Sequence, residues 1–199
     1  MGPLPRGRNL TFQYKTNWCA ITGAPSSGKT SVIEELAHRG YAVQSEVARE
    51  LIEAALRAGK TLADIRDADH VKTLQHRILK LKLAREKGLK HDALVFTDRG
   101  TPDSIAYFRL AGLDTGEAVK ASKTFQYRAI FLFERLRLVK DDVRTENDQQ
   151  ALALEQAFVE DYESLGYKIT RVPVLPVAER ADFILKALGI NPAQPPVGT

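Results

Sequence analysis

The stretch Gly23-Ala24-Pro25-Ser26-Ser27-Gly28-Lys29-Thr30 decides the fold. It matches the pattern G-x-x-x-x-G-K-[ST] at every fixed position. Glycines let the backbone of such a loop turn sharply, so that several backbone N–H groups point toward phosphate oxygens. The N-terminus of a following helix adds its positive end. The stretch therefore predicts a phosphate-binding loop, and the complete match disfavours the alternative of a glycine-rich turn that only caps a helix.

The residues on either side of the loop have the patterns that a phosphate-binding loop needs. The apolar run 18–22 precedes it as an expected strand, and 30–39 follows it as an expected helix. Lys29 should reach the β- and γ-phosphates of a nucleoside triphosphate, and Thr30 should place its hydroxyl group on Mg²⁺. The residues expected to bind the nucleotide are Gly23, Ala24, Pro25, Ser26, Ser27, Gly28, Lys29, Thr30 and Ser31.

Short apolar runs alternate with helical patterns along the rest of the chain. The expected strands are 18–22, 41–43, 94–97, 129–133 and 168–172, and the expected helices are 30–39, 46–58, 69–87, 101–111, 148–165 and 177–188. Apolar strands separated by helices predict a parallel sheet that is covered on both faces. We therefore expect an α/β fold with three layers, α/β/α, around a five-stranded parallel sheet.

A single domain accounts for the whole chain. We expect it to span 17–189, between a flexible lead-in at 1–16, with an additional strand around 10–14, and a flexible proline-rich tail at 190–199. Two expected helices carry apolar residues at steps of three or four, which predicts that both stripes pack in the core. The stripes are Val71, Leu74, Ile78 and Leu81, and Leu154, Phe158, Tyr162 and Leu165.

The composition excludes several classes of protein. Of the 199 residues, 44% are hydrophobic and 27% are charged, which excludes disorder along the whole chain. The sequence has no run of about 18 apolar residues, so we expect no membrane span. Cys19 is the single cysteine, which excludes a disulfide framework and a cysteine-rich zinc site, and we expect it to be an inert buried thiol.

The charge balance favours small anionic ligands. The net charge is +4, and the basic residues are scattered along the chain rather than gathered in one stripe. Phosphorylated small molecules satisfy this balance as well as DNA would, so we expect no nucleic-acid partner. Because the N-terminal residues lack the apolar segment of a secretory signal, we expect a cytoplasmic protein. The oligomeric state stays open.

A carboxylate stands where the third expected strand ends. Asp98 follows the run 94–97, and Arg99 comes directly after it. The carboxyl ends of parallel strands face the ligand crevice of an open α/β sheet. We therefore expect Asp98 to hold Mg²⁺ or its water ligands and Arg99 to contact the substrate.

The next helix begins close to this carboxylate. Pro102 suits the first turn of the expected helix 101–111, with Thr101 as its cap. Asp103 is a candidate substrate-binding residue, and the alternative is that it only complements the positive end of the helix.

The helix after the second expected strand opens with Glu46 and Arg49. We expect Glu46 to orient an acceptor hydroxyl group or to take its proton, with Arg49 beside it as a substrate-binding residue. The alternative for Glu46 is compensation of the helix dipole.

A charged segment covering about 134–150 follows the fourth expected strand and has little apolar periodicity. It contains Arg135, Arg137, Lys140 and Arg144 among acidic residues. We expect a lid whose arginines, Arg144 in particular, close over the phosphates during transfer. The alternative is a solvated charged loop.

Four segments resemble the NadR-type AAA/kinase family of P-loop proteins: ITGAPSSGKTSVIEEL, SEVAREL, FTDRGTPDSIAYF and KDDVRTEN. The stretch DRG-x-x-D-S-x-A-Y is also similar to the stretch DRY-x-x-S-x-x-A-Y of thymidylate kinases. The resemblance covers about 17–188. It implies a P-loop NTPase fold with a nucleoside-monophosphate-kinase-like core and the strand order 2-3-1-4-5.

The resemblance also implies roles for individual residues. It implies that Gly23 through Thr30 hold the phosphates of ATP and Mg²⁺. Asp98 and Arg99 match the acid and the phosphate-facing arginine of the DRY-like motif. Glu46 and Arg49 match the acceptor-side pair of the NadR-type kinases, and Arg144 matches a lid arginine.

Two classes of function remain. The first is a kinase that uses Mg²⁺ and ATP to transfer the γ-phosphate to a small nucleoside-like or nucleotide-like metabolite, with Lys29, Glu46, Asp98 and Arg144 as its catalytic residues. The alternative is a nucleotide-dependent switch or NTPase, using ATP or GTP, without a small-molecule acceptor. The kinase is favoured because a carboxylate pair, a basic lid and an acceptor-side crevice accompany the loop. The identity of the acceptor stays open.

Overall fold

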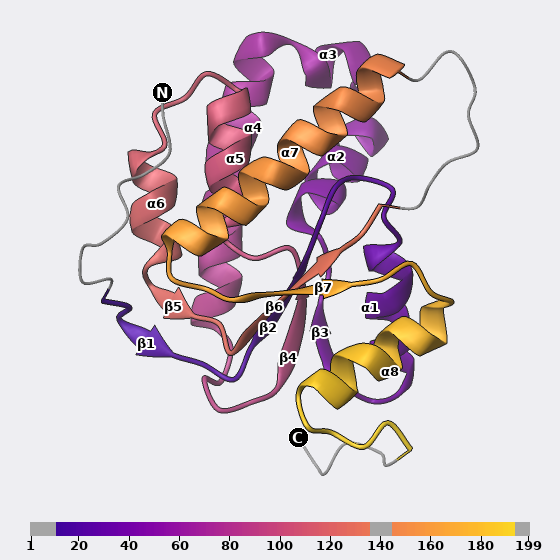
Figure 1. Cartoon of the computed structure of the whole chain (residues 1–199). Helices are drawn as coiled ribbons and strands as arrows, with labels where there is room; N and C mark the ends of the chain where they lie inside the picture. Colours follow the sequence, from indigo (N-terminus) through magenta and orange to yellow (C-terminus); the bar gives the residue numbers. More distant parts are fainter. Residues whose placement is uncertain (1–10, 136–144, 194–199) are drawn as a thin grey trace.

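The computed structural model describes residues 11–135 and 145–193. Its centre is a five-stranded parallel sheet with the order β3-β4-β2-β6-β7 (Figure 1). Numbered along the chain, this order is 2-3-1-4-5, as the resemblance implied, and the predicted fold class is confirmed. The strands are β2 (Cys19–Thr22), β3 (Ala42–Gln44), β4 (Val95–Asp98), β6 (Ala129–Phe133) and β7 (Ile169–Val172).

The strands are apolar on both faces because helices cover both sides of the sheet. Cys19 and Ile21 of β2 point into one core cluster, whereas Trp18 and Ala20 point into the other. This alternation follows from the period of two along a strand.

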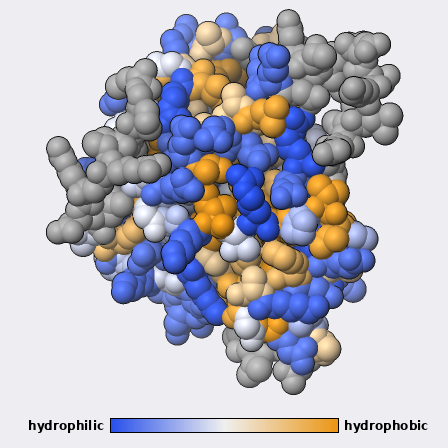
Figure 2. All heavy atoms as spheres, viewed as in Figure 1, coloured by the Kyte–Doolittle hydropathy of each residue, from blue (hydrophilic) through white to orange (hydrophobic). Residues whose placement is uncertain are grey.

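Hydrophilic residues cover most of the molecular face in Figure 2, and hydrophobic residues lie between them in small groups.

Helices α1 (Lys29–His38) and α8 (Val177–Ala187) lie side by side on one face of the sheet. Helices α5 (Asp103–Leu110) and α7 (Thr145–Ser164) cover the other face, and α4 (Ala68–Lys87) packs against α5 (Figure 1). Helix α2 (Val47–Arg57) packs against α4 and leads from β3 toward that layer. The arrangement brings the phosphate-loop end of α1 and the first residues of α2 and α5 to one edge of the sheet.

The structure contains short elements that the sequence patterns did not predict. They are α3 (Leu62–Arg66), α6 (Gly116–Ser122) and β5 (Phe125–Gln126). Strand β5 pairs in parallel with β1 (Tyr14–Lys15), which overlaps the end of the additional strand expected around 10–14. Each is too short to show a full period of hydrophobic residues. The capping box in which Thr61 and Asp64 exchange hydrogen bonds fixes the start of α3, and this pair was the available sequence signal.

The predicted core packing of the stripe on α7 is confirmed. Leu154, Phe158, Tyr162 and Leu165 are each at most 7% exposed. Cys19 is buried as predicted, and burial raises the pKa of its thiol to about 12. Within residues 11–135 and 145–193, every helix is too short or too polar to cross a bilayer.

A close approach behind β4 requires a glycine at position 100. A Cβ atom there would lie 2.7 Å from Tyr162 Oη and 3.2 Å from Tyr127 Cζ. Both tyrosines are buried and hydrogen-bonded, so neither ring can move aside easily. We predict that Gly100→Ala lowers the free energy of unfolding by about 1–3 kcal/mol through overpacking, measured by urea denaturation.

The matched control is Gly88→Ala at the C-terminal end of α4. Gly88 has right-handed backbone angles, and a Cβ atom there would meet Arg85 O at an ordinary 3.4 Å. We expect this variant to be as stable as the wild type or slightly more stable. Equal stability of the two variants would show that the space behind position 100 is not limiting.

Candidate functional site

The phosphate-binding loop lies between β2 and α1, at the carboxyl end of the central strand. Gly23 has φ +139°, and a Cβ atom on it would lie 2.8 Å from Phe133 O, so only glycine fits. Ser26 has φ +61°, an uncommon left-handed conformation for a residue other than glycine. The loop is therefore held in a conformation that its surroundings must support.

Lys29 folds back over the loop that precedes it. Its Nζ donates hydrogen bonds to Gly23 O at 3.1 Å, Ala24 O at 2.9 Å and Ser27 Oγ at 3.2 Å. Burial and, to a lesser degree, the nearby charge of Arg99 together lower the pKa of Lys29 to about 7. A phosphate group beside Nζ would offset this cost, because it would give the buried ammonium group a counter-charge.

Thr30 and Asp98 lie together, as the sequence predicted for a magnesium site. Thr30 Oγ1 donates to Asp98 Oδ2 at 3.1 Å. The other carboxylate oxygen, Asp98 Oδ1, is buried and has no hydrogen-bond partner among residues 11–135 and 145–193. Burial raises the pKa of Asp98, and the charge of Glu46 raises it further. An unpaired carboxylate oxygen beside a hydroxyl group fits Mg²⁺, which prefers oxygen ligands.

Arg99 connects the loop to the opposite side of the site. Its Nε donates to Glu46 Oε1 at 2.7 Å, and its Nη1 donates to Gly23 O at 3.1 Å. The guanidinium group packs against the rings of Tyr107 and Phe158, 5.5 Å and 5.4 Å from their centroids. One buried cation therefore fixes both the first turn of the loop and the head of α2.

Asp103 lies behind Arg99 and not on the surface of the site. Its carboxylate is fully buried and accepts hydrogen bonds from Thr22 Oγ1, Gly100 N and Tyr162 Oη. It also pairs with Arg99 Nη1 at 3.4 Å. Asp103 is therefore fixed by its own partners and helps to hold Arg99 in place. Any effect of Asp103 on a substrate would pass through Arg99.

The prediction that Thr101 caps the helix α5 was wrong. The N-cap position belongs to Pro102, and α5 begins at Asp103. Thr101 Oγ1 instead donates to Glu86 Oε1 of α4 at 2.6 Å, and Tyr127 Oη donates to the same oxygen. The Thr101 hydroxyl group, which the local sequence assigns to the helix cap, therefore donates to the buried carboxylate of Glu86 on the neighbouring helix.

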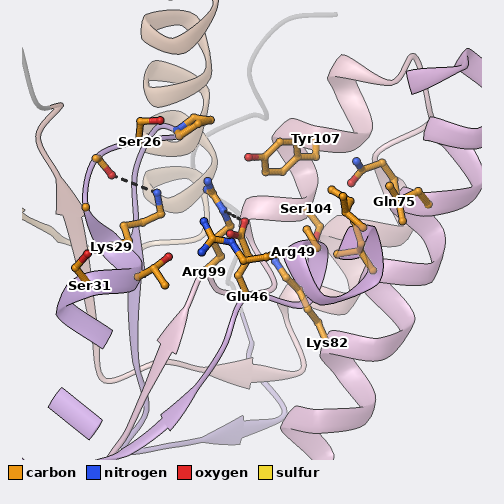
Figure 3. Close-up of a pocket in the computed structure, with 18 of the residues that line it drawn as sticks. Ser26, Lys29, Ser31, Glu46, Arg49, Gln75, Lys82, Arg99, Ser104 and Tyr107 are labelled. Carbon is orange, nitrogen blue, oxygen red and sulfur yellow. Dashed lines mark hydrogen bonds and ion pairs between the residues drawn. The ribbon is translucent and has the colours of Figure 1, made fainter. Parts of the chain in front are cut away.

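A cavity of about 580 Å³ opens beside the loop (Figure 3). In the close-up, Ser26, Lys29 and Ser31 stand on one side and Gln75, Ser104 and Tyr107 on the other, with Arg99 and Glu46 between them. The lining residues are Pro25, Ser26, Ser27, Gly28, Lys29, Thr30, Ser31, Glu34, Glu46, Ala48, Arg49, Ile52, Leu74, Gln75, Ile78, Lys82, Arg99, Ser104 and Tyr107. The structure therefore brings the predicted nucleotide residues 25–31 and Glu46, Arg49 and Arg99 to one cavity, whereas Gly23, Ala24 and Asp98 are not among its lining residues.

The far wall of the cavity includes residues that sequence analysis did not assign to a site. Leu74 and Ile78, predicted to pack in the core, also line the cavity. Ile78 is buried as predicted, whereas Leu74 is half-buried. Lys82 is 6% exposed and donates to Gly100 O at 2.8 Å, and burial lowers its pKa. Ser104 Oγ is buried, and no residue that the structure describes forms a hydrogen bond with it. Lys82 follows Ile78 by four positions and so lies on the same face of the helix. A lysine on an apolar helix face was the sequence signal that this face borders a polar cavity.

Two expectations about charged residues remain predictions. Arg49 is exposed at the cavity, and no hydrogen bond or ion pair joins it to another residue in the described part of the chain. Arg144 and most of the expected lid 134–150 lie outside the described residues; α7 begins at Thr145.

Most of the sequence matches a family model, and the fold matches known structures. The sequence model of a family described as an AAA domain matches residues 18–180, which is most of the chain. The comparison with curated proteins found no match. Two structures of NadR, one in complex with NAD and AMP-PNP and one in complex with NR, superpose with TM-scores of 0.65 at 16% identity. They cover 92% of this chain, which spans about half of theirs, 52% and 54%.

Two shorter proteins match over nearly their whole length. Deoxyadenosine kinase from M. mycoides superposes with a TM-score of 0.57 at 15% identity, over 86% of this chain and 98% of its own. Thymidylate kinase from Ehrlichia chaffeensis superposes with a TM-score of 0.54 at 14% identity, over 87% of this chain and 98% of its own. The chain therefore belongs to the AAA domain family, and its fold is the one shared by NadR, deoxyadenosine kinase and thymidylate kinase.

Proposed function

We propose that this protein is a phosphotransferase that uses Mg²⁺ and ATP and transfers the γ-phosphate to a small nucleoside-like or nucleotide-like acceptor. The observation that carries the proposal is that the phosphate-binding loop and an acceptor-side wall line one cavity. Arg99 and Glu46 stand between the two walls, where a transferred phosphoryl group would pass. A switch without an acceptor would need the loop but not the second wall.

On the nucleotide side, the backbone N–H groups of the loop 23–28 would bind the phosphates. Lys29 would give up its bonds to the loop carbonyl groups and bind the β- and γ-phosphates. Thr30 and Asp98 would hold Mg²⁺, which supplies positive charge to the phosphate oxygens when it is bound. The complex of NadR with AMP-PNP supports a nucleoside triphosphate as the donor in this fold.

On the acceptor side, Glu46 has the geometry to orient a hydroxyl group. Arg99 holds its Oε1. Among the described residues no hydrogen bond is made to its Oε2, which is therefore free to accept one. Glu46 is the N-cap of α2 and has extended backbone angles, which aim its side chain at the cavity. A carboxylate so fixed would align the attacking oxygen and take its proton.

The lining of the far wall supports an acceptor that combines a flat apolar part with several oxygen atoms. Tyr107, Leu74 and Ile78 supply apolar surface, whereas Lys82 and Ser104 supply buried hydrogen-bond donors. Nucleosides and nucleotides have this combination. The complexes of NadR with NR and of deoxyadenosine kinase with dCMP support the same class of ligand in this fold.

Removing the loop lysine tests the donor side. We predict that Lys29→Ala lowers ADP formation about 100-fold or more, because the charge that stabilises the transferring phosphoryl group is lost. The measurement is steady-state ADP release with Mg²⁺ and ATP, with folding checked by circular dichroism. Lys80→Ala, which removes an exposed lysine from α4, is the control and should retain full activity. Wild-type turnover by a folded Lys29→Ala protein would contradict the assignment.

Removing the charge of Asp98 tests the metal site. Asp98→Asn keeps the shape of the side chain, so we predict little change in metal-free ATP affinity and a collapse of magnesium-dependent turnover. The experiment titrates MgCl₂ in turnover assays and measures ATP binding by calorimetry with EDTA. Asp92→Asn, at an exposed position before β4, is the control. An unchanged magnesium dependence in Asp98→Asn would mean that the ion is held elsewhere.

The substitution Glu46→Gln separates a kinase from a switch. If Glu46 serves an acceptor hydroxyl group, the variant should lose about 100-fold or more of acceptor-stimulated ADP release and keep its ATP affinity. Glu53→Gln, an exposed position on the same helix, should behave as the wild type. Stimulation that survives in Glu46→Gln would exclude Glu46 as the base. Failure of nucleosides, nucleoside monophosphates and sugars to stimulate the wild type would favour the switch.

A further inference from the structure

Helix α8 contributes a buried arginine to the phosphate-binding loop. Arg180 is 3% exposed, and its Nη1 donates to Ser27 O at 2.7 Å. The two residues are 153 positions apart in the sequence. Arg180 is not among the cavity-lining residues, so it reaches the loop from behind.

Arg180 is buried without an ion-pair partner among the described residues, and the charge of Glu134 acts on it only from beyond ion-pair distance. The guanidinium group packs on Phe133, 5.4 Å from the ring centroid, and its Nε is buried without a hydrogen-bond partner in the described part of the chain. No carboxylate of the described residues lies within ion-pair distance of it. Burying a cation without a paired carboxylate is costly. The bond to Ser27 O is the one hydrogen bond of this guanidinium group in the described part of the chain.

The geometry of the peptide group gives this bond a consequence for the ligand. The structure has no cis peptide bond among its described residues, so the carbonyl of Ser27 and the N–H of Gly28 point in opposite directions. Because Arg180 holds the carbonyl toward α8, the Gly28 N–H points away from α8. Ser27 and Gly28 both line the cavity, so an N–H turned away from α8 is the one that a phosphate in the cavity could reach.

We propose that Arg180 is a positioning residue for nucleotide phosphates, which acts by fixing the Ser27–Gly28 peptide so that its N–H points into the phosphate site. The left-handed conformation of Ser26 directly before this peptide makes such support necessary, since an unsupported loop can relax to other conformations. The proposal rests on the proposed binding of a nucleoside triphosphate by the loop. The proposal adds Arg180, on the distant helix α8, to the residues that support that binding.

The test compares the binding of ADP and of inorganic tripolyphosphate by calorimetry in the wild type and in Arg180→Met. Loss of a hydrogen bond donated by a charged group should weaken both ligands about tenfold or more. The two losses of affinity should be similar, because Arg180 acts on the phosphate-binding loop and not on the part of the site that would contact the adenine base. Arg180→Lys, which keeps the charge and one donor, should recover part of the affinity.

Arg39→Met is the matched control. Arg39 also joins α1 to α8, through Asp182 and the carbonyl of Ala178, but it makes no bond to the loop. This variant should bind both ligands within about twofold of the wild type, since the phosphate cradle is untouched. An equal loss in Arg39→Met would assign the effect to helix packing and overturn the proposal.

The other outcomes are also decisive. Wild-type affinity in Arg180→Met, or a loss confined to ADP, would overturn the positioning role. If Arg180→Met does not fold, Arg180→Gln replaces it with the same expected losses and the same contradicting results. Failure of the wild type to bind either ligand would instead contradict the proposed function.

Discussion

Buried cations hold the backbone of the phosphate-binding loop by its carbonyl groups. Lys29 and Arg99 both donate to Gly23 O, Lys29 also donates to Ala24 O, and Arg180 donates to Ser27 O. Each bound carbonyl turns the N–H of the same trans peptide to the opposite side. Arg99 and Arg180 keep Gly23 O and Ser27 O satisfied even when Lys29 turns to a phosphate, so the loop can present N–H donors without rearranging, which is a form of electrostatic preorganisation.

Arg99 extends this arrangement across the cavity. The guanidinium group is desolvated, which is tolerable because Glu46, Asp103 and the carbonyl of Gly23 surround it with acceptors. The same contacts couple the loop to the N-cap residue of α2. A displacement of Glu46 would therefore shift Arg99 and, through it, the carbonyl group of Gly23. The two walls of the cavity are thus joined by direct bonds and not only by packing.

The sequence predicted the parts of the molecule that depend on neighbouring residues. The loop, the five strands and the longer helices follow from local motif and periodicity. Thr30 and Asp98 could be assigned to one candidate magnesium site because Thr30 stands at a helix start and Asp98 at a strand end. Contacts between distant segments left no such signal. Arg180 looks like an exposed helical arginine in the sequence, and its bond to Ser27 arises only when α8 packs beside α1. Leu74 and Ile78 were assigned to the core because an apolar stripe does not show whether it faces packing or a cavity.

Following the phosphoryl group itself tests the central claim most directly. The protein is incubated with Mg²⁺, ATP labelled in the γ-phosphate, and a panel of nucleosides, nucleotides and sugars, and the products are separated and identified by mass spectrometry. A phosphotransferase predicts that one class of acceptor gains the labelled phosphoryl group in a one-to-one ratio with the ADP formed. Release of all the label as inorganic phosphate, whatever acceptor is present, would contradict transfer and identify an NTPase.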